Sequence, residues 1–237
     1  MAWVAEENFD SYSTGDLDGG AGGSGWSSAW AAQNANEMLV STGQYLNSPN
    51  SLNTSDSGGA GDYRRPLTTS FATGTLYFAF YVTAGAAEFV LNLRAGGLAT
   101  MGITLAANGD IKVLARTPSI AWYTVGTFSD DTMYIMEMDI DTTSDQYRVR
   151  WKEEGGEYGA YSSYYTPRNT SSITQITLNS NPTSFAVYID AISATDPDAS
   201  ASTSIKSRNG LAIASVKSIN GLAIASIKSV NGISNVS

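Results

Sequence analysis

Three acidic residues alternate along YIMEMDID (residues 134–141), and carboxyl groups at this spacing could act together in acid–base catalysis. Glu137, Asp139 and Asp141 would share one face of a strand, because side chains two residues apart point the same way. Two carboxyl groups about 5–5.5 Å apart, one with a raised pKa, can hydrolyse a glycosidic bond with retention. The alternative is a solvated acidic face beside a turn. We favour that alternative, and we expect no catalytic residue and no enzymatic activity.

The composition excludes catalytic and metal sites that depend on cysteine or histidine. The chain has no cysteine and no histidine among its 237 residues, which excludes disulfide bonds and thiolate metal sites. Ser-His-Asp and Cys-His catalysis are excluded for the same reason.

Aromatic side chains lie in or beside expected loops, and the densest run is YGAYSSYY at residues 158–165. Flat rings with polar tips can stack on sugars or anchor protein contacts. In a β-sandwich most Trp and Tyr side chains instead belong to the core or to strand edges, so both interpretations stay open. The candidate glycan-binding residues are Trp26, Trp30, Trp122, Tyr123, Tyr161, Tyr164 and Tyr165.

Short segments rich in β-branched and aromatic residues recur along the chain, each bounded by turn residues. No segment shows a 3.6-residue apolar period, which indicates an all-β fold, a jelly-roll β-sandwich. Asn108-Gly109 predicts a hairpin turn between two of the segments. The most regular strands are expected at 75–82, 88–95, 101–107, 110–116, 123–128, 133–141, 147–152, 173–179 and 184–193.

The last stretch, residues 204–237, repeats an eleven-residue unit that contains Asn-Gly each time, at 209–210, 220–221 and 231–232. Asn-Gly favours type I′ hairpin turns, so we expect a short β-repeat tail. An eleven-residue helical period and a disordered tail are the alternatives; Gly and β-branched residues disfavour the first, and the high Ile, Leu and Val content disfavours the second. Such hairpins need a partner to bury their apolar side chains. The candidate assembly residues are Leu211, Ile213, Val216, Ile219, Leu222, Ile224 and Ile227.

Charge divides the chain in the same way. Residues 1–198 hold all 22 acidic residues and nine of the 13 basic ones, whereas residues 199–237 hold the other four basic residues and no acidic one. An acidic body argues against nucleic-acid binding, which requires the opposite charge.

No apolar stretch reaches about 18 residues, so we expect no membrane insertion. The beginning, MAWVAEENFD, has no signal-peptide pattern.

Four segments resemble the concanavalin A-like jelly roll, in its laminin G-like or carbohydrate-binding-module form. They are ENFDSYSTGDL…GGSGW, ITLAANGDIKV, YIMEMDIDTTSDQYRVRW and FAVYIDAIS. The tail resembles Asn-Gly-rich repeats at the C-termini of bacteriophage structural proteins. These resemblances imply a jelly-roll domain at residues 1–196, a linker at 197–204, and a repeat tail for assembly or anchoring at 205–237.

The resemblance also implies two chemical sites. Carbohydrate-binding jelly rolls often hold a structural Ca²⁺ between acids of the first and last strands, and Glu7, Asp10 and Asp190 match those places. Calcium takes six to eight oxygen ligands, so backbone carbonyls would complete the site. Family 16 glycoside hydrolases, which share the fold, use a Glu, Asp and Glu cluster on one strand. Here the third acid is Asp141, one methylene shorter than Glu.

The resemblance implies a non-enzymatic structural or attachment protein of a phage particle, located on the virion or outside the cell. Its tail would form a homo-oligomer, for example a trimer, or bind other virion proteins. The alternative is a carbohydrate-binding module or adhesin that binds a cell-surface glycan. A glycoside hydrolase using Glu137, Asp139 and Asp141 ranks below both. None of these interpretations requires a cofactor; Ca²⁺ is the one ion that the resemblance suggests could be bound.

Overall fold

The computed structural model describes residues 3–34, 38–46, 49–54, 61–83, 88–116, 119–181 and 186–199, together with six two-residue strands between 207 and 234. Two compact units are present, Met1–Pro197 and Asp198–Ser237. All elements of the described residues are strands, and they contain no helix. None of the described residues forms an apolar helix long enough to cross a membrane.

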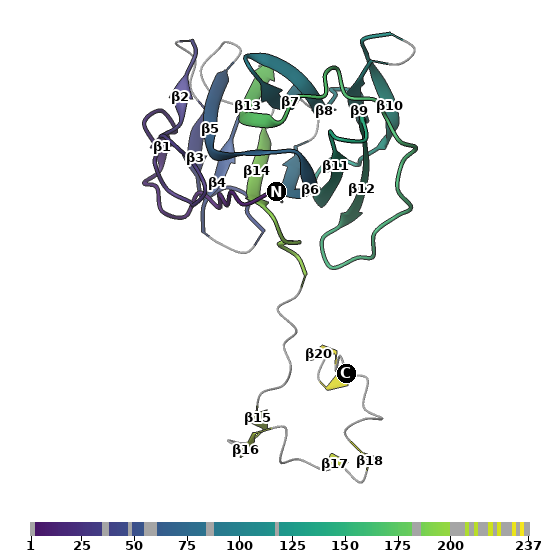
Figure 1. Ribbon diagram of the computed structural model, residues 1–237. Helices are drawn as coiled ribbons and strands as arrows, with labels where there is room; N and C mark the ends of the chain where they lie inside the picture. The colour runs from purple at the N-terminus through teal and green to yellow at the C-terminus, as the bar shows by residue number, and fades with distance from the viewer. Residues whose placement is uncertain are drawn as a thin grey trace. The chain divides into compact units, whose positions relative to one another are not determined.

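The first unit is a sandwich of two seven-stranded sheets whose neighbouring strands are antiparallel (Figure 1). We call one of them the β11 sheet; it has the strand order β1-β3-β4-β14-β6-β11-β12. Its strands are β1 (Gly15–Asp16), β3 (Leu39–Ser41), β4 (Ser51–Asn53), β14 (Val187–Ser193), β6 (Thr73–Val82), β11 (Met133–Asp141) and β12 (Gln146–Glu153).

The other sheet, here called the β7 sheet, has the order β10-β9-β8-β7-β13-β5-β2. Its strands are β10 (Ala121–Thr127), β9 (Asp110–Ala115), β8 (Leu98–Leu105), β7 (Glu88–Ala95), β13 (Ile173–Asn181), β5 (Asp62–Phe71) and β2 (Ala31–Ala32). Asn108-Gly109 lies between β9 and β8, where Gly109 takes a positive φ of 81°. The predicted all-β sandwich is therefore confirmed.

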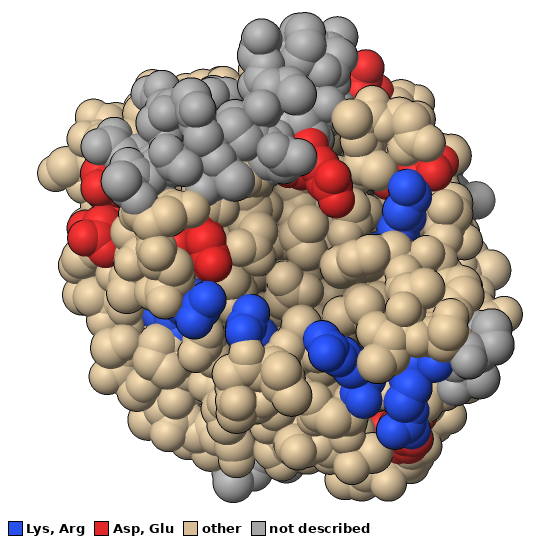
Figure 2. All heavy atoms as spheres, turned by 90° about the horizontal axis from the view of Figure 1, so that it is seen from above, with Lys and Arg blue, Asp and Glu red and all other residues tan. Residues whose placement is uncertain are grey.

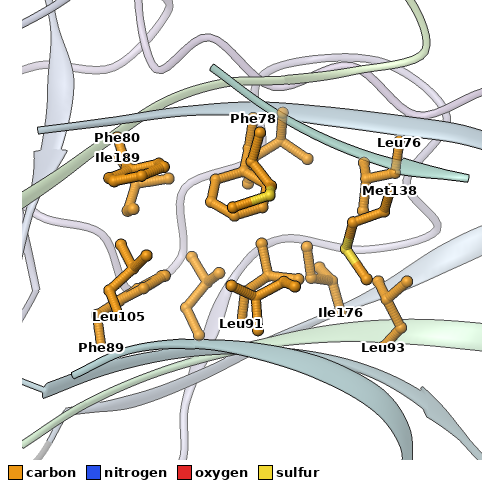
Figure 3. Packing of buried hydrophobic residues seen from close by; sticks show 14 of the residues in the cluster. Leu76, Phe78, Phe80, Phe89, Leu91, Leu93, Leu105, Met138, Ile176 and Ile189 are labelled. Carbon is orange, nitrogen blue, oxygen red and sulfur yellow. The ribbon is translucent and has the colours of Figure 1, made fainter. Parts of the chain in front are cut away.

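The core lies between the two sheets and follows the two-residue period of the strands (Figure 3). Phe78 and Phe80 of β6 and Met138 of β11 face Phe89 and Leu91 of β7, and all five side chains are fully buried. Each such burial contributes about 1.5–3 kcal/mol relative to an exposed side chain. The same alternation leaves the intervening side chains of each strand on an outer face.

The outer face of the β11 sheet is partly apolar as well. Ala79, Met133, Ile135 and Leu46 form a second buried cluster there. The sequence pattern placed the acids of residues 133–141 on a solvated face, so the prediction missed the cover over this face. Tyr77, Tyr81 and Tyr158 pack against the cluster and supply part of that cover.

Residues 159–165 run along the free edge of β12. Tyr165 and Tyr147 exchange two backbone hydrogen bonds of 2.7 and 2.9 Å, and the backbone N–H of Ser162 donates to the carbonyl of Val149 at 2.8 Å. At the far edge of the other sheet, the pairing of β10 with β9 contains an irregularity between Thr124 and Gly126.

The second unit contains three separate two-stranded hairpins. In each hairpin two residues separate the paired strands, and these two are the Asn-Gly of one repeat unit. This confirms the predicted β-repeat. Among the candidate assembly residues, Leu211, Ile219 and Leu222 lie in these strands, while Ile213, Val216, Ile224 and Ile227 lie outside the described residues. The strands are β15 (Ser207–Arg208), β16 (Leu211–Ala212), β17 (Ser218–Ile219), β18 (Leu222–Ala223), β19 (Ser229–Val230) and β20 (Ile233–Ser234).

Candidate functional site

The outer face of the β7 sheet carries a continuous polar row. Strand register places Arg64 of β5 opposite Thr177 of β13, Thr177 opposite Asn92 of β7, and Asn92 opposite Gly102 of β8. The flanking residues of these strands, such as Leu91 and Leu178, fill the core, so the row faces outward. Figure 2 views the molecule onto this face, where basic and acidic side chains both border a central hollow.

Trp122 of β10 extends across this face toward β8. A Cβ atom at Gly102 would lie 3.1 Å from Cη2 of Trp122 and 2.6 Å from Oδ1 of Asn92. The absence of a side chain at Gly102 therefore lets the indole ring and the amide approach each other. The ring of Trp122 remains 38% exposed, which places an exposed apolar surface beside a polar one.

Two of the buried polar atoms on β7 and β8 that have no hydrogen-bond partner among the described residues are oxygens of this face. They are Oδ1 of Asn92 and Oγ1 of Thr104, and both are buried. The amide nitrogen of Asn92 donates to Oδ1 of Asn179 at 3.2 Å, which orients its oxygen away from that residue. A buried polar atom without a partner costs about 1–3 kcal/mol, so each is placed to bind a donor brought by a ligand or solvent.

Among the predicted aromatic residues, Trp26 and Trp30 belong to a buried cluster around Arg65. The guanidinium group of Arg65 lies 4.8 Å from the ring of Trp26 and 5.6 Å from that of Trp30. Trp30 is only 1% exposed, so its assignment to glycan binding is wrong: neither ring face can reach a ligand. Trp26 is partly buried against the core and donates from Nε1 to the carbonyl of Glu6 at 3.0 Å.

The four candidate tyrosines are divided between two places. Tyr123 and Tyr165 pack against the core, with ring centroids 6.2 Å apart. Tyr161 and Tyr164 lie over the guanidinium group of Arg148, at 3.9 and 4.8 Å, on the side of the β11 sheet. The seven predicted aromatic residues are thus not gathered into one site, and Trp122 alone of them lies on the polar row of the β7 sheet.

Neither Asn92 nor Thr104 was predicted from the sequence. A signal for Asn92 was present, because EFVLNLRA places it among the polar residues on one face of a strand whose other face is apolar. Nothing local identifies Thr104, since Thr is ordinary on a strand.

The predicted metal residue Glu7 is committed to another role. Its side chain is 0% exposed, forms a salt bridge with Arg65, and accepts hydrogen bonds from Tyr12 at 2.6 Å and Trp30 at 3.2 Å. The backbone N–H of Phe9 donates to its other oxygen at 3.0 Å. Both carboxylate oxygens are therefore satisfied by protein donors, and the assignment of Glu7 as a metal ligand is wrong.

Asp10 and Asp190 line, with Glu7, a pocket of about 490 Å³ between the N-terminal segment and the end of β14. Burial raises the pKa of Asp190 to about 7, and the negative charges of Asp10 and Glu7 add to that rise. Backbone N–H groups of Leu46 and Ala191 donate to its two oxygens at 3.0 and 2.7 Å. No group of three or more metal-ligating side chains occurs in the described part of the chain, so the three-acid Ca²⁺ site is not assembled there.

The three acids of β11 are each engaged by protein groups. Glu137 is buried, pairs with Arg150 at 2.8 Å and accepts from the hydroxyl of Tyr161. Asp139 pairs with Arg148 at 2.9 Å. The expectation of a solvated acidic face therefore fails at Glu137, because the segment containing Tyr161 covers it.

Asp141 acts as a turn residue. Its Oδ1 accepts hydrogen bonds from the N–H of Ser144 at 3.0 Å and from the hydroxyl of Thr143 at 2.6 Å. Hydrogen bonds from Ser144 and Thr143 lower the pKa of this carboxyl to about 2. A retaining glycosidase needs one carboxyl group with a raised pKa, and Asp141 is shifted in the opposite direction.

Comparison with known proteins relates the chain to solved structures alone. No family model matches the chain, and no curated protein matches it. A sialidase aligns at 11% identity over 71% of this chain, with a TM-score of 0.51, and the match covers 17% of the sialidase chain. Lectin II from Ulex europaeus aligns at 9% identity (79% of this chain, 98% of that one, TM-score 0.44). Carbohydrate binding module CBM66 from Bacillus subtilis aligns at 13% identity (69% and 95%, TM-score 0.47). At identities this low the alignments bear on the fold alone, which is the all-β sandwich described above.

Proposed function

We propose that the jelly-roll unit binds a glycan on the outer face of the β7 sheet and does not cleave it. The observation that carries the proposal is the pair of unpartnered buried oxygens, on Asn92 and Thr104, on the same face as the exposed Trp122, whose ring lies beside Asn92. A sugar ring offers hydroxyl donors on its edge and apolar C–H groups on its face. It can satisfy the oxygens and cover the indole at the same time.

The absence of catalysis is part of the proposal. The acid cluster predicted from the sequence lies on β11, in the opposite sheet from the polar row. Glu137 and Asp139 are held in ion pairs with arginines, and Asp141 caps a turn. This arrangement supports a structural role for the three carboxylates.

We also propose that the repeat tail assembles or anchors the glycan-binding unit. Its hairpins are short, and two-stranded hairpins are marginal by themselves, so partners from other copies or from other proteins would stabilise them. Display outside the cell on a phage particle, with the tail joining subunits into a trimer or another homo-oligomer, is the finer form of this proposal. It requires no cofactor.

A glycan-array screen of the full chain tests the binding proposal. Trp122→Ala should lower affinity for any hit about tenfold, since an aromatic contact of about 1.4 kcal/mol corresponds to that factor. Tyr164→Ala is the matched control, because Tyr164 is an exposed aromatic residue stacked on Arg148 away from the polar row. Binding that survives Trp122→Ala and disappears with Tyr164→Ala would place the site elsewhere, and a screen without any hit would refute glycan binding.

A further inference from the structure

Basic side chains are scarce in the acidic body, and their placement is uneven. Four of the nine in residues 1–198 are paired with carboxylates away from the polar row: Arg65 with Glu7, Arg148 with Asp139, Arg150 with Glu137 and Lys152 with Asp196. Strand alternation places three others, Arg64, Arg94 and Lys112, on the outer face of the β7 sheet. Three of the nine basic side chains of the body thus lie on the face that we propose binds a glycan.

Arg94 is the basic side chain of this face whose positive charge is least neutralised by neighbouring groups. It lies on β7, two residues from Asn92 and opposite Gln175 of β13. Among the described residues it has no salt bridge, and its Nε is buried without a hydrogen-bond partner. One of its terminal nitrogens donates to the carbonyl of Gly97, which holds the side chain over the strand end.

Two other guanidinium groups lie near enough to repel it. Burial lowers the pKa of Arg94, and the positive charges of Arg64 and Arg168 lower it further. The backbone N–H of Arg168 donates to the carbonyl of Thr100, which fixes that residue beside β8. Arg64 has one carboxylate partner, Asp62, with the long separation of 3.4 Å, and its Nε is also buried without a partner. Three cations therefore converge on a single nearby acid.

We infer that the glycan bound on the polar row is acidic, and that its anionic group binds at Arg94 together with Arg64 and Arg168. Guanidinium groups form charge-assisted, bidentate hydrogen bonds with carboxylate, sulfate or phosphate, and these bonds would use the unpartnered nitrogens. Arg94 and Asn92 are about 7 Å apart along β7, so one ligand can reach both. The inference rests on the proposed function, because the same face supplies the contacts to the neutral part of the sugar.

Long-range electrostatic attraction between the body and an acidic glycan does not account for such binding. The body carries 22 acidic residues against nine basic ones, so at long range it repels an anionic polymer. A preference for acidic glycans would then arise locally, at these arginines. Three sources share the chemistry, namely uronic acids, sulfated sugars and phosphorylated sugars, and matched pairs of probes separate them.

The test measures binding of the full chain to three matched pairs of polysaccharides. They are polygalacturonate and its methyl ester, dextran sulfate and dextran, and phosphomannan and mannan. The inference predicts that in at least one pair the acidic member binds about tenfold more tightly than the neutral one, and that added NaCl weakens this preference. The pair that shows the preference identifies the anion.

Arg94→Gln should abolish the preference while leaving binding of neutral glycans within about twofold. Lys112→Gln is the matched control, because it makes the same charge change on the same face at a side chain already 3.7 Å from Asp110. If both variants lose acidic binding equally, overall charge is responsible and the inference is overturned.

Equal binding of acidic and neutral members by the unmodified protein overturns the inference but leaves the proposed function standing. Failure to bind any glycan on the array or in these pairs refutes both. The salt dependence of the unmodified protein does not depend on any variant folding. Arg94→Lys, which keeps the charge but loses the bidentate geometry, should retain part of the preference.

Discussion

Replacement of Arg65 by Met removes the centre of a buried polar cluster that joins the N-terminal segment to β5. Arg65 is 2% exposed and forms a salt bridge with Glu7, whose side chain is 0% exposed. Its other nitrogens donate to the carbonyls of Ser28 at 3.0 Å and Gly22 at 2.6 Å. The residue thus connects three places in residues 7–28 to the β7 sheet.

The cost follows from what the substitution leaves behind. Met fills much of the volume, but the carboxylate of Glu7 stays buried with only the donors from Tyr12, Trp30 and Phe9. Breaking a buried ion pair on one side costs about 3–5 kcal/mol, because the remaining charge is uncompensated. For a chain of this size each kcal/mol corresponds to roughly 2–4 °C in melting temperature, so we expect a decrease of roughly 6–20 °C.

Urea denaturation followed by tryptophan fluorescence measures this change, since Trp26 and Trp30 lie beside Arg65. Arg116→Met is the matched control, because Arg116 pairs with Asp145 at the surface, where an ion pair is worth about 0–1 kcal/mol. Glu7→Leu combined with Arg65→Met should recover part of the loss, since no buried charge then remains. A loss in Arg65→Met as small as in Arg116→Met would refute the structural role given to this pair.

Two further predictions concern the Asp190 pocket and the tail. Folded Asp190 has a pKa near 7 against an ordinary value of 3.8, so the folded protein binds more protons between these values, and its stability should fall by up to about 4 kcal/mol as pH rises from 4 to 7. A series of denaturation curves across that range should show this slope for the unmodified protein and a flatter one for Asp190→Asn; equal slopes would contradict the assignment. Removal of residues 199–237 should leave a folded, monomeric jelly roll that still binds glycan, with the change in mass followed by light scattering. An identical oligomer with and without these residues would show that the tail does not assemble the protein.

The strand pattern of the sandwich could be predicted because it depends on local alternation. Met136, Met138 and Ile140 point into the core, as the two-residue period requires. The cover over the other face of the same strand could not be predicted, because Tyr158 and Tyr161 come from a different part of the chain. Their approach depends on residues 159–165 pairing along β12.

The candidate site was predictable only in part, for a similar reason. Trp122 could be chosen from its residue type, but the space for its ring is provided by Gly102 on another strand. Glu7 was predicted as a metal ligand, but it pairs with Arg65, which lies 58 residues away in the chain. Pairings over such separations leave no pattern in a single sequence.

The pairing of residues 159–165 with β12 affects how the domain behaves beside other copies of itself. An open strand edge is a template on which another chain can add a strand, and this segment occupies one such edge of the β11 sheet. At the β10 edge of the other sheet, the irregularity between Thr124 and Gly126 interrupts the regular ladder. Both features hinder the joining of sheets between neighbouring copies. If the tail joins copies of the chain, as we propose, these two edges would help the neighbouring sandwich domains to resist aggregation.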